Sequence, residues 1–277
     1  MFVVMFEQTK SRPDTQNLEG ARIFAVANQK GGVGKTTTAI NLATAMAAVK
    51  KRVLLIDLDP QGNASTGLGI ERSRATVNSY HVLIGEAEPK DATLGTTIPG
   101  LFVIPSGVDL SGAEIELIDV EAREFRLRAA LEAVSEEYDF ILIDCPPALN
   151  LLTINALVAA QSVLVPLQCE FFALEGISHL MKTVERIGRA FNPGLDIQGI
   201  VLTMFDKRNN LSDMVANDVR DFFGDKVYKT VIPRNVRVSE APSHGRPVII
   251  YDTRCAGSQA YLHLASEVLR RERRLGA

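Results

Sequence analysis

Short apolar runs alternate along this chain with longer stretches of helical character. The runs lie at residues 24–27, 53–56, 102–104, 141–143, 162–165, 200–203 and 226–231. Most of them lack the alternation of polar and apolar residues that marks a half-exposed strand, as expected of parallel strands buried on both faces. The pattern therefore predicts an α/β fold, with a single doubly wound, mainly parallel twisted sheet and helices on both of its faces.

The same pattern suggests how the chain divides. Residues 1–20 are expected to form a loose extension, because their apolar start is too short and too acidic for a signal peptide. Residues 21–277 are expected to form one domain, since a chain of 277 residues with 46% hydrophobic residues can bury its own core. No membrane span is expected, because polar residues and a proline interrupt the longest apolar region, residues 148–167.

A glycine-rich segment follows the first apolar run and precedes a stretch of helical character at residues 37–48. Glycines let backbone N–H groups close around phosphate oxygens, and the start of a helix adds the positive end of its dipole. A strand, a glycine-rich loop and a helix in this order are the context of a phosphate-binding loop. The expected nucleotide contacts are Lys30, Gly31, Gly32, Val33, Gly34, Lys35, Thr36 and Thr37.

This loop carries two lysines, because Gln29 stands where the motif G-x-x-x-x-G-K-[ST] has its first glycine and Lys30 follows it. Lys35 is expected to reach the β- and γ-phosphates, and the Thr36 hydroxyl to bind Mg²⁺. Lys30 precedes the glycines and cannot easily fold back over its own γ-phosphate. We expect it to cross to a second molecule and neutralise charge during phosphoryl transfer there, as an arginine finger does. Both lysines are candidate catalytic residues.

Two further apolar runs end in carboxylates. Asp57 and Asp59 follow the run at residues 53–56, and they face the same way because alternate residues of a strand share a face. Asp144 closes the run at residues 141–143, in the pattern of a carboxylate that holds the water shell of Mg²⁺. Such strand ends lie where open α/β sheets bind ligands. Thr36 and Asp144 are therefore expected at a metal site.

These motifs resemble those of the ParA/MinD family of deviant Walker A ATPases, and most closely the chromosomal ParA, or Soj-type, partition ATPases. The resemblance extends from about Ile23 to Leu269. It implies ATP and Mg²⁺ as cofactors, with Asp59 orienting the attacking water as a catalytic residue and Asp57 supporting the metal shell. It also implies a homodimer that closes on ATP and binds double-stranded DNA without sequence preference. Hydrolysis is implied to be slow until a ParB-like centromere-binding protein stimulates it through a basic peptide.

The resemblance also assigns residues in the C-terminal third of the chain. The formal net charge is −3, but from Val201 onward Lys and Arg outnumber Asp and Glu. A local excess of positive charge is what non-specific DNA binding requires, whatever the sign of the net charge. The implied DNA contacts are Arg208 and Arg237, and the residues implied to frame the adenine are Met204, Pro233 and Asn235.

The main alternative is a MinD-like, membrane-associated positioning ATPase, which would need an amphipathic anchor. Residues 260–274 form an amphipathic stretch with a basic tail. We interpret this stretch as a final packing helix, because its apolar face is small and has no Trp or Phe. The expected protein is therefore not bound to a membrane.

Three other classes fit the sequence less well. A redox ATPase would need cluster-bridging cysteines, whereas Cys145, Cys169 and Cys255 lack C-x-x-C spacing and indicate a reducing cytoplasm. An amide ligase of the same superfamily usually carries an extra catalytic domain, for which this length leaves no room. A non-enzymatic DNA scaffold would have no use for Asp59. The expected localisation is cytoplasmic and nucleoid-associated.

Overall fold

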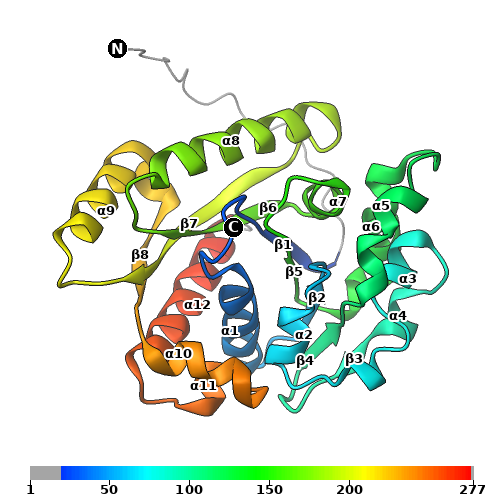
Figure 1. Ribbon diagram of the computed structural model, residues 1–277, viewed down its shortest axis with the longest axis horizontal. Helices are drawn as coiled ribbons and strands as arrows, with labels where there is room; N and C mark the ends of the chain where they lie inside the picture. The colour runs from blue at the N-terminus through cyan, green and yellow to red at the C-terminus, as the bar shows by residue number, and fades with distance from the viewer. Residues whose placement is uncertain (1–19, 276–277) are drawn as a thin grey trace.

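The computed structural model describes residues 20–275, and its centre is an eight-stranded sheet (Figure 1). The strand order is β3-β4-β2-β5-β1-β6-β7-β8. Neighbouring strands are parallel, except for β3 and β4. The predicted extension, residues 1–20, lies outside the described residues apart from Gly20. The strands are β1 (Arg22–Val26), β2 (Val53–Asp57), β3 (Leu94–Gly95), β4 (Leu101–Ile104), β5 (Phe140–Asp144), β6 (Ser162–Gln168), β7 (Asp196–Phe205) and β8 (Val227–Pro233).

The central strands are buried on both faces, which explains their continuous apolar sequences. Every residue of β2 and of β5 is buried. Each of the seven predicted runs overlaps a strand, and the predicted α/β fold is confirmed. The sequence pattern missed β3, because this antiparallel edge strand pairs only two residues with β4, too few to show a periodicity.

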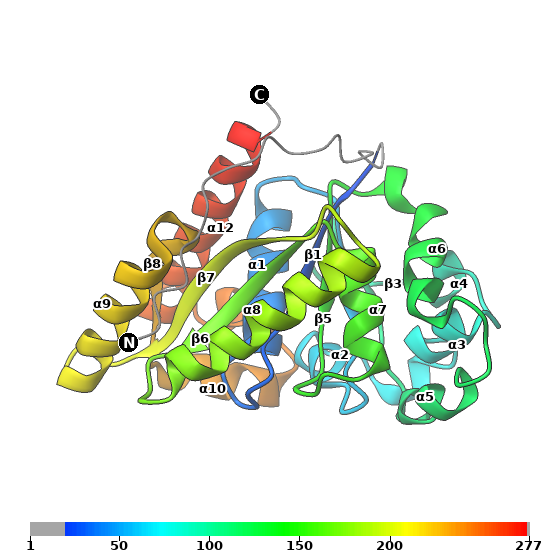
Figure 2. The same ribbon diagram turned by 90° about the horizontal axis from the view of Figure 1, so that it is seen from above.

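The helices are α1 (Lys35–Ala48), α2 (Asn63–Gly67), α3 (Ser79–Ile84), α4 (Pro89–Ala92), α5 (Ala113–Glu116), α6 (Arg126–Glu132), α7 (Leu151–Ala159), α8 (Ala173–Ala190), α9 (Asn210–Phe223), α10 (Val236–Glu240), α11 (Val248–Tyr251) and α12 (Ala256–Leu275). They form two layers, each with its own hydrophobic cluster. One cluster joins the sheet to α1, α2, α11 and α12. The other joins it to α3, α6, α7, α8 and α9, and Figure 2 shows α8 lying across the strands on that side.

The C-terminal helix α12 packs against the sheet and the phosphate-loop helix. Tyr261, Leu264 and Val268 are buried, and the hydroxyls of Tyr261 and Thr38 in α1 lie 3.4 Å apart. Glu267 accepts hydrogen bonds from two backbone N–H groups of β8. The interpretation of this stretch as a packing helix is therefore confirmed, because its apolar face already has partners. Among residues 20–275, no helix combines the length and the apolar character needed to cross a bilayer.

Candidate nucleotide-binding site

The candidate site lies where the order of strands reverses. The chain passes from β1 to β2, returns through β5 to a place beside β1, and continues to β6 on the other side of β1. Ligands of open α/β sheets bind at such a switch point, beyond the carboxyl ends of the strands. In register, Asp144 of β5 faces Val26 of β1 on one side and Asp57 of β2 on the other. The sheet therefore brings together the phosphate loop and the acidic strand ends.

The phosphate loop needs glycine at two positions. Gly32 has φ 73° and Gly34 has φ 86°, in the left-handed region that other residues rarely adopt. Gly34 is the N-cap of α1 and offers no side chain to the first turn of that helix. The N–H groups at the start of α1 are thus left for a ligand, and an anion there is also favoured by the helix dipole.

Two polar residues outside the motif hold the loop in place. The Thr203 hydroxyl of β7 donates a hydrogen bond of 2.8 Å to the carbonyl oxygen of Val33. The Asn28 side chain accepts from the N–H of Lys30 at 3.0 Å and donates to the carbonyl oxygen of Pro166 at 2.8 Å. Both side chains are buried. The sequence analysis missed them, although Asn28 directly follows the first apolar run, residues 24–27.

The two lysines of the loop have different surroundings. Lys35 is 6% exposed, and its Nζ donates to the carbonyl oxygen of Lys30 at 3.0 Å. Burial lowers the pKa of Lys35, and the nearby carboxylate of Asp144 opposes that change. The side chain of Lys30 is 48% exposed and forms an ion pair with Glu170, which precedes α8. Sequence reasoning had given no chemistry to Glu170.

Asp144 is a buried carboxylate whose surroundings would suit a cation. It is fully buried, and neither carboxylate oxygen has a hydrogen-bond partner. Burial raises the pKa of Asp144 well above its ordinary value, and the charge of Asp57 raises it further. Buried polar groups normally have partners, and Mg²⁺ with its water shell would supply them here. The geometry therefore fits a magnesium ion beside Thr36.

The other two aspartates are bound to the loop that follows β2. Asp57 accepts hydrogen bonds from the backbone N–H of Ser65 at 2.8 Å and from its hydroxyl at 2.7 Å. Burial raises the pKa of Asp57 to about 6. Asp59 is 7% exposed and accepts from the N–H of Gln61 at 3.0 Å. The role of Asp57 thus includes holding α2 through Ser65, which the sequence did not indicate, while its proposed support of the metal shell stays a prediction.

The residues predicted to frame a base lie at the ends of β7 and β8. Met204 has φ 50°, an unusual value for a residue other than glycine, and lies beside Gly34 of the phosphate loop. Pro233 ends β8, and the Asn235 side chain caps α10 by accepting from the N–H of Arg237 at 2.9 Å. The cap does not use the Asn235 amide as a donor. The base contacts therefore stay a prediction.

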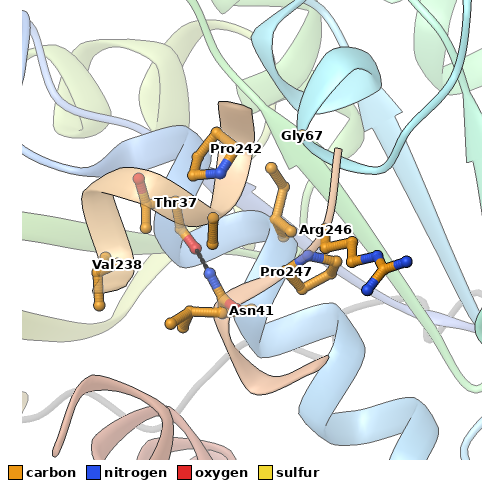
Figure 3. A pocket seen from close by; sticks show the side chains of 10 residues that line it. Thr37, Asn41, Gly67, Val238, Pro242, Arg246 and Pro247 are labelled. Carbon is orange, nitrogen blue, oxygen red and sulfur yellow. Dashed lines mark hydrogen bonds between the residues drawn. The ribbon is translucent and has the colours of Figure 1, made fainter. Parts of the chain in front are cut away.

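A small cavity adjoins this region between α1 and α10 (Figure 3). Asn41 lines it one helical turn after Thr37, and its amide donates to the Thr37 carbonyl oxygen at 2.8 Å. The buried side-chain oxygen of Asn41 has no hydrogen-bond partner. Val238 and Pro242 close the opposite wall.

Arg208 and Arg237 follow the ends of β7 and β8. Their side chains are 87% and 53% exposed. Both are engaged in ion pairs within the chain, Arg208 with Asp206 and Arg237 with Glu240 and Asp252. The sequence predicted the exposure of these arginines but not their acidic partners.

The fold and this geometry define a P-loop nucleotide hydrolase. A family model for the AAA domain matches residues 21–197. The chromosome partitioning protein ParA of Caulobacter vibrioides is 64% identical over 254 residues, which are 91% of this chain and 95% of that protein. The sporulation initiation inhibitor protein Soj of Bacillus subtilis is 55% identical over 247 residues, 89% and 98% of the two chains. The chain therefore belongs to the ParA/Soj family of chromosome-partitioning ATPases, as its motifs had indicated.

A solved structure from Mycobacterium smegmatis corrects one step of the sequence analysis. It is described as cobyrinic acid a,c-diamide synthase with bound ATP analog and magnesium. It has a TM-score of 0.80 and 37% identity, and covers 91% of this chain and 96% of that one. A chain of matching length thus carries an amide-synthase name, so length alone does not separate the partition class from an amide ligase. The higher identity to ParA and Soj supports the partition class instead.

Asp144 yields a prediction about stability without metal. Because burial raises its pKa in the folded state, folding takes up a proton, and the cost in stability grows as pH rises from the ordinary pKa of an aspartate to the folded pKa. Asp144→Asn is therefore expected to raise the free energy of unfolding by about 1–3 kcal/mol near neutral pH, and by less near pH 5. Thermal melting in the presence of a chelator measures both values.

The control for this variant is Asp225→Asn at an exposed position. It should change the melting temperature little at either pH. Adding Mg²⁺ with ATP should stabilise the wild type more than Asp144→Asn. Equal gains from Mg²⁺ in the two proteins would contradict the place given to Asp144.

Proposed function

We propose that this partition ATPase is a switch in which an ATP-bound homodimer holds DNA and hydrolysis releases it. Its relatives named ParA and Soj support the partition role. The observation that carries the proposal is the contrast between the two lysines of one loop. Lys35 is 6% exposed beside its own phosphate loop, whereas the side chain of Lys30 is 48% exposed and extends to Glu170. A buried lysine suits the phosphates of its own chain, and a half-exposed one suits those of a neighbour.

The ligand in this proposal is ATP with Mg²⁺. The N–H groups of the loop and of the first turn of α1 bind the phosphates, and Lys35 moves from the Lys30 carbonyl to the β- and γ-phosphates. Thr36 and Asp144 hold the magnesium shell, with support from Asp57. Bound Mg²⁺ neutralises charge on the phosphates. Asp59 orients the attacking water from its place beside the site.

The position of Lys30 supports the proposed dimer. Its ammonium group is occupied by Glu170 in the single chain, at the surface of the molecule. The triphosphate of a second subunit is a stronger attractor than one exposed carboxylate, because exposed ion pairs stabilise weakly. Binding of ATP thus replaces the Lys30–Glu170 ion pair within one chain by a contact between Lys30 and the triphosphate of the second subunit. Hydrolysis removes the γ-phosphate, and this contact between the chains is then no longer favoured.

The DNA surface is formed by the loops after β7 and β8, which carry Arg208 and Arg237. These side chains are exposed, and phosphate contacts from arginine give affinity without sequence preference. Pairing two subunits doubles the surface and raises the affinity of the pair through effective concentration. A ParB-like partner then accelerates hydrolysis and releases the dimer from DNA.

The test of this proposal is DNA retention by the wild type and by the double variant Arg208→Glu, Arg237→Glu. With a non-hydrolysable ATP analogue, the wild type should bind duplex DNA tightly, with affinity falling steeply with salt. The variant should lose at least about tenfold per arginine, because each reversal replaces a phosphate contact with repulsion. Fluorescence anisotropy measures binding, and analytical ultracentrifugation should show the dimer intact.

A matched control reverses two arginines elsewhere. Like Arg208 and Arg237, Arg128 and Arg189 form ion pairs with an acid of their own chain. In each of these two control pairs the acid is four residues away. Reversing both changes the net charge equally and should leave most of the DNA affinity in place. Wild-type protein that binds no DNA with the analogue would contradict the proposal.

A further inference from the structure

Both candidate DNA-binding arginines are engaged by carboxylates of their own chain. Arg208 donates to Asp206 through two nitrogens, from Nε at 3.0 Å and from Nη2 at 2.9 Å. Arg237 donates from Nη1 to Glu240 at 2.9 Å, and its Nε lies 3.6 Å from a carboxylate oxygen of Asp252. Tyr251 places its hydroxyl 3.5 Å from the same oxygen of Glu240.

These ion pairs occupy guanidinium N–H donors of Arg208 and Arg237 that phosphates of DNA would need. A carboxylate and a phosphate bind the guanidinium group through the same planar set of N–H donors, so the two anions compete for one arginine. The side chains of Asp206 and Glu240 are 25% and 40% exposed, and their arginines are more exposed still. A phosphate can therefore reach each arginine from solvent, but it must displace the carboxylate from the donors it takes.

The pairing is selective among nearby cations. Lys207 and Arg234 are exposed in the same loops, and neither forms an ion pair with any residue in the range 20–275. Hydrogen bonds from the side chain and the backbone N–H of Arg208 lower the pKa of the Asp206 carboxyl to about 2, so this acid is ionised near neutral pH. The two carboxylates thus pair with Arg208 and Arg237, whereas Lys207 and Arg234 have no ion pair within residues 20–275.

We propose that Asp206 and Glu240 are affinity-setting residues that compete with DNA phosphates for Arg208 and Arg237 and keep the DNA affinity of a single subunit low. The inference rests on the DNA-binding function proposed above and adds its regulation. A subunit that must give up two internal ion pairs binds DNA weakly alone. Two subunits joined by ATP multiply their weak contacts, so retention depends more sharply on dimer formation.

The experiment compares Asp206→Asn, Glu240→Gln and the double variant with wild type. Asn at position 206 keeps an oxygen for the N–H of Arg208, which Asp206 accepts at 3.0 Å, so the turn is preserved. Each single variant should tighten DNA binding of the nucleotide-free protein about threefold, and the double variant about tenfold, because exposed ion pairs are individually weak. The probe is a labelled duplex of arbitrary sequence, followed by anisotropy at two salt concentrations.

Two controls separate release of the arginines from a general loss of negative charge. Glu185→Gln removes a carboxylate that pairs with Arg189. Both residues lie near the C-terminal end of α8, outside the loops that carry Arg208 and Arg237. Asp213→Asn removes an exposed carboxylate in the first turn of α9, close to Arg208 in sequence, that has no ion pair in the described part of the chain. Both variants should bind within about twofold of wild type.

The outcomes are distinct. Tightening by the double variant with both controls unchanged supports the inference. If wild type with an ATP analogue binds DNA and the variants bind no tighter, the inference is overturned while the proposed function stands. Equal tightening by Asp213→Asn overturns it as well, because local charge would then suffice. Wild type that binds no DNA with the analogue overturns the proposed function, and the inference with it.

Discussion

Replacing Lys30 by Ala is expected to lower the rate of ATP hydrolysis by about 10³-fold or more, the range found when a cation supplied in trans is removed from phosphoryl transfer. Nucleotide binding should fall far less, because Lys35 and the N–H groups of the loop remain. The half-exposed Lys30 side chain pairs with Glu170, which lies outside the phosphate loop. In the proposed dimer its loss acts on the neighbouring subunit, so dimer formation with ATP should weaken in parallel.

Single-turnover hydrolysis and ultracentrifugation with an ATP analogue measure these two effects. Lys51→Ala is the matched control, since Lys51 is 41% exposed and pairs with one acid, Asp139, as Lys30 does with Glu170. It should retain full activity. Mixing Lys30→Ala with a variant that binds no nucleotide would place the intact lysine opposite the bound ATP, and activity should reappear in part. Full turnover by Lys30→Ala alone would refute the role in trans.

The fold and the phosphate loop were predictable because both rest on local pattern. Strands buried on both faces, such as β2 and β5, need continuous apolar residues, and the loop needs glycine where φ is positive. Asp57 and Asp144 are in register on neighbouring strands, so a parallel sheet brings them together once its order is known. These features depend on short segments whose physical requirements are visible one residue at a time.

The partners of the site residues were not predictable in this way. Glu170 is 140 residues from Lys30 along the chain, and Thr203 is 170 residues from Val33. Their contacts depend on which strand lies beside which and on the exit of each loop from the sheet. A glutamate before a helix and a threonine within a strand carry no local signal of such a contact. The sequence thus predicted the groups proposed to bind the nucleotide and missed the groups that hold them in place.

The acidic partners of Arg208 and Arg237 show a different limit of prediction from the sequence. Asp206 lies two residues from Arg208 and Glu240 three from Arg237, so both pairs are local. A count of charges from Val201 onward shows an excess of Lys and Arg. Such a count does not show which of these cations form ion pairs with carboxylates of their own chain. In the structure Arg208 and Arg237 are both paired with acids, and in the proposed DNA surface this pairing would limit the charge available to phosphates.

Asp59→Ala is expected to lower hydrolysis by about 10²- to 10⁴-fold, the contribution of a positioned general base or water-orienting group. Lys30, Lys35 and the candidate magnesium residues remain, so ATP binding and dimer formation should persist. The variant should accumulate as an ATP-loaded dimer on DNA, because release waits on hydrolysis. Its dissociation from immobilised duplex DNA, followed after a switch to nucleotide-free buffer, should be much slower than that of wild type.

The local structure offers a sharper version of this test. Asp59 also accepts a hydrogen bond from the N–H of Gln61 at 3.0 Å, so the alanine variant loses both a carboxylate and a turn contact. Asp59→Asn keeps an acceptor for that N–H and removes only the charge and basicity. If the carboxylate acts on water, both variants lose hydrolysis and both stay on DNA. If Asp59→Asn hydrolyses ATP and leaves DNA as wild type does, the residue serves the turn alone, and the group that orients the water must be sought elsewhere in the loop.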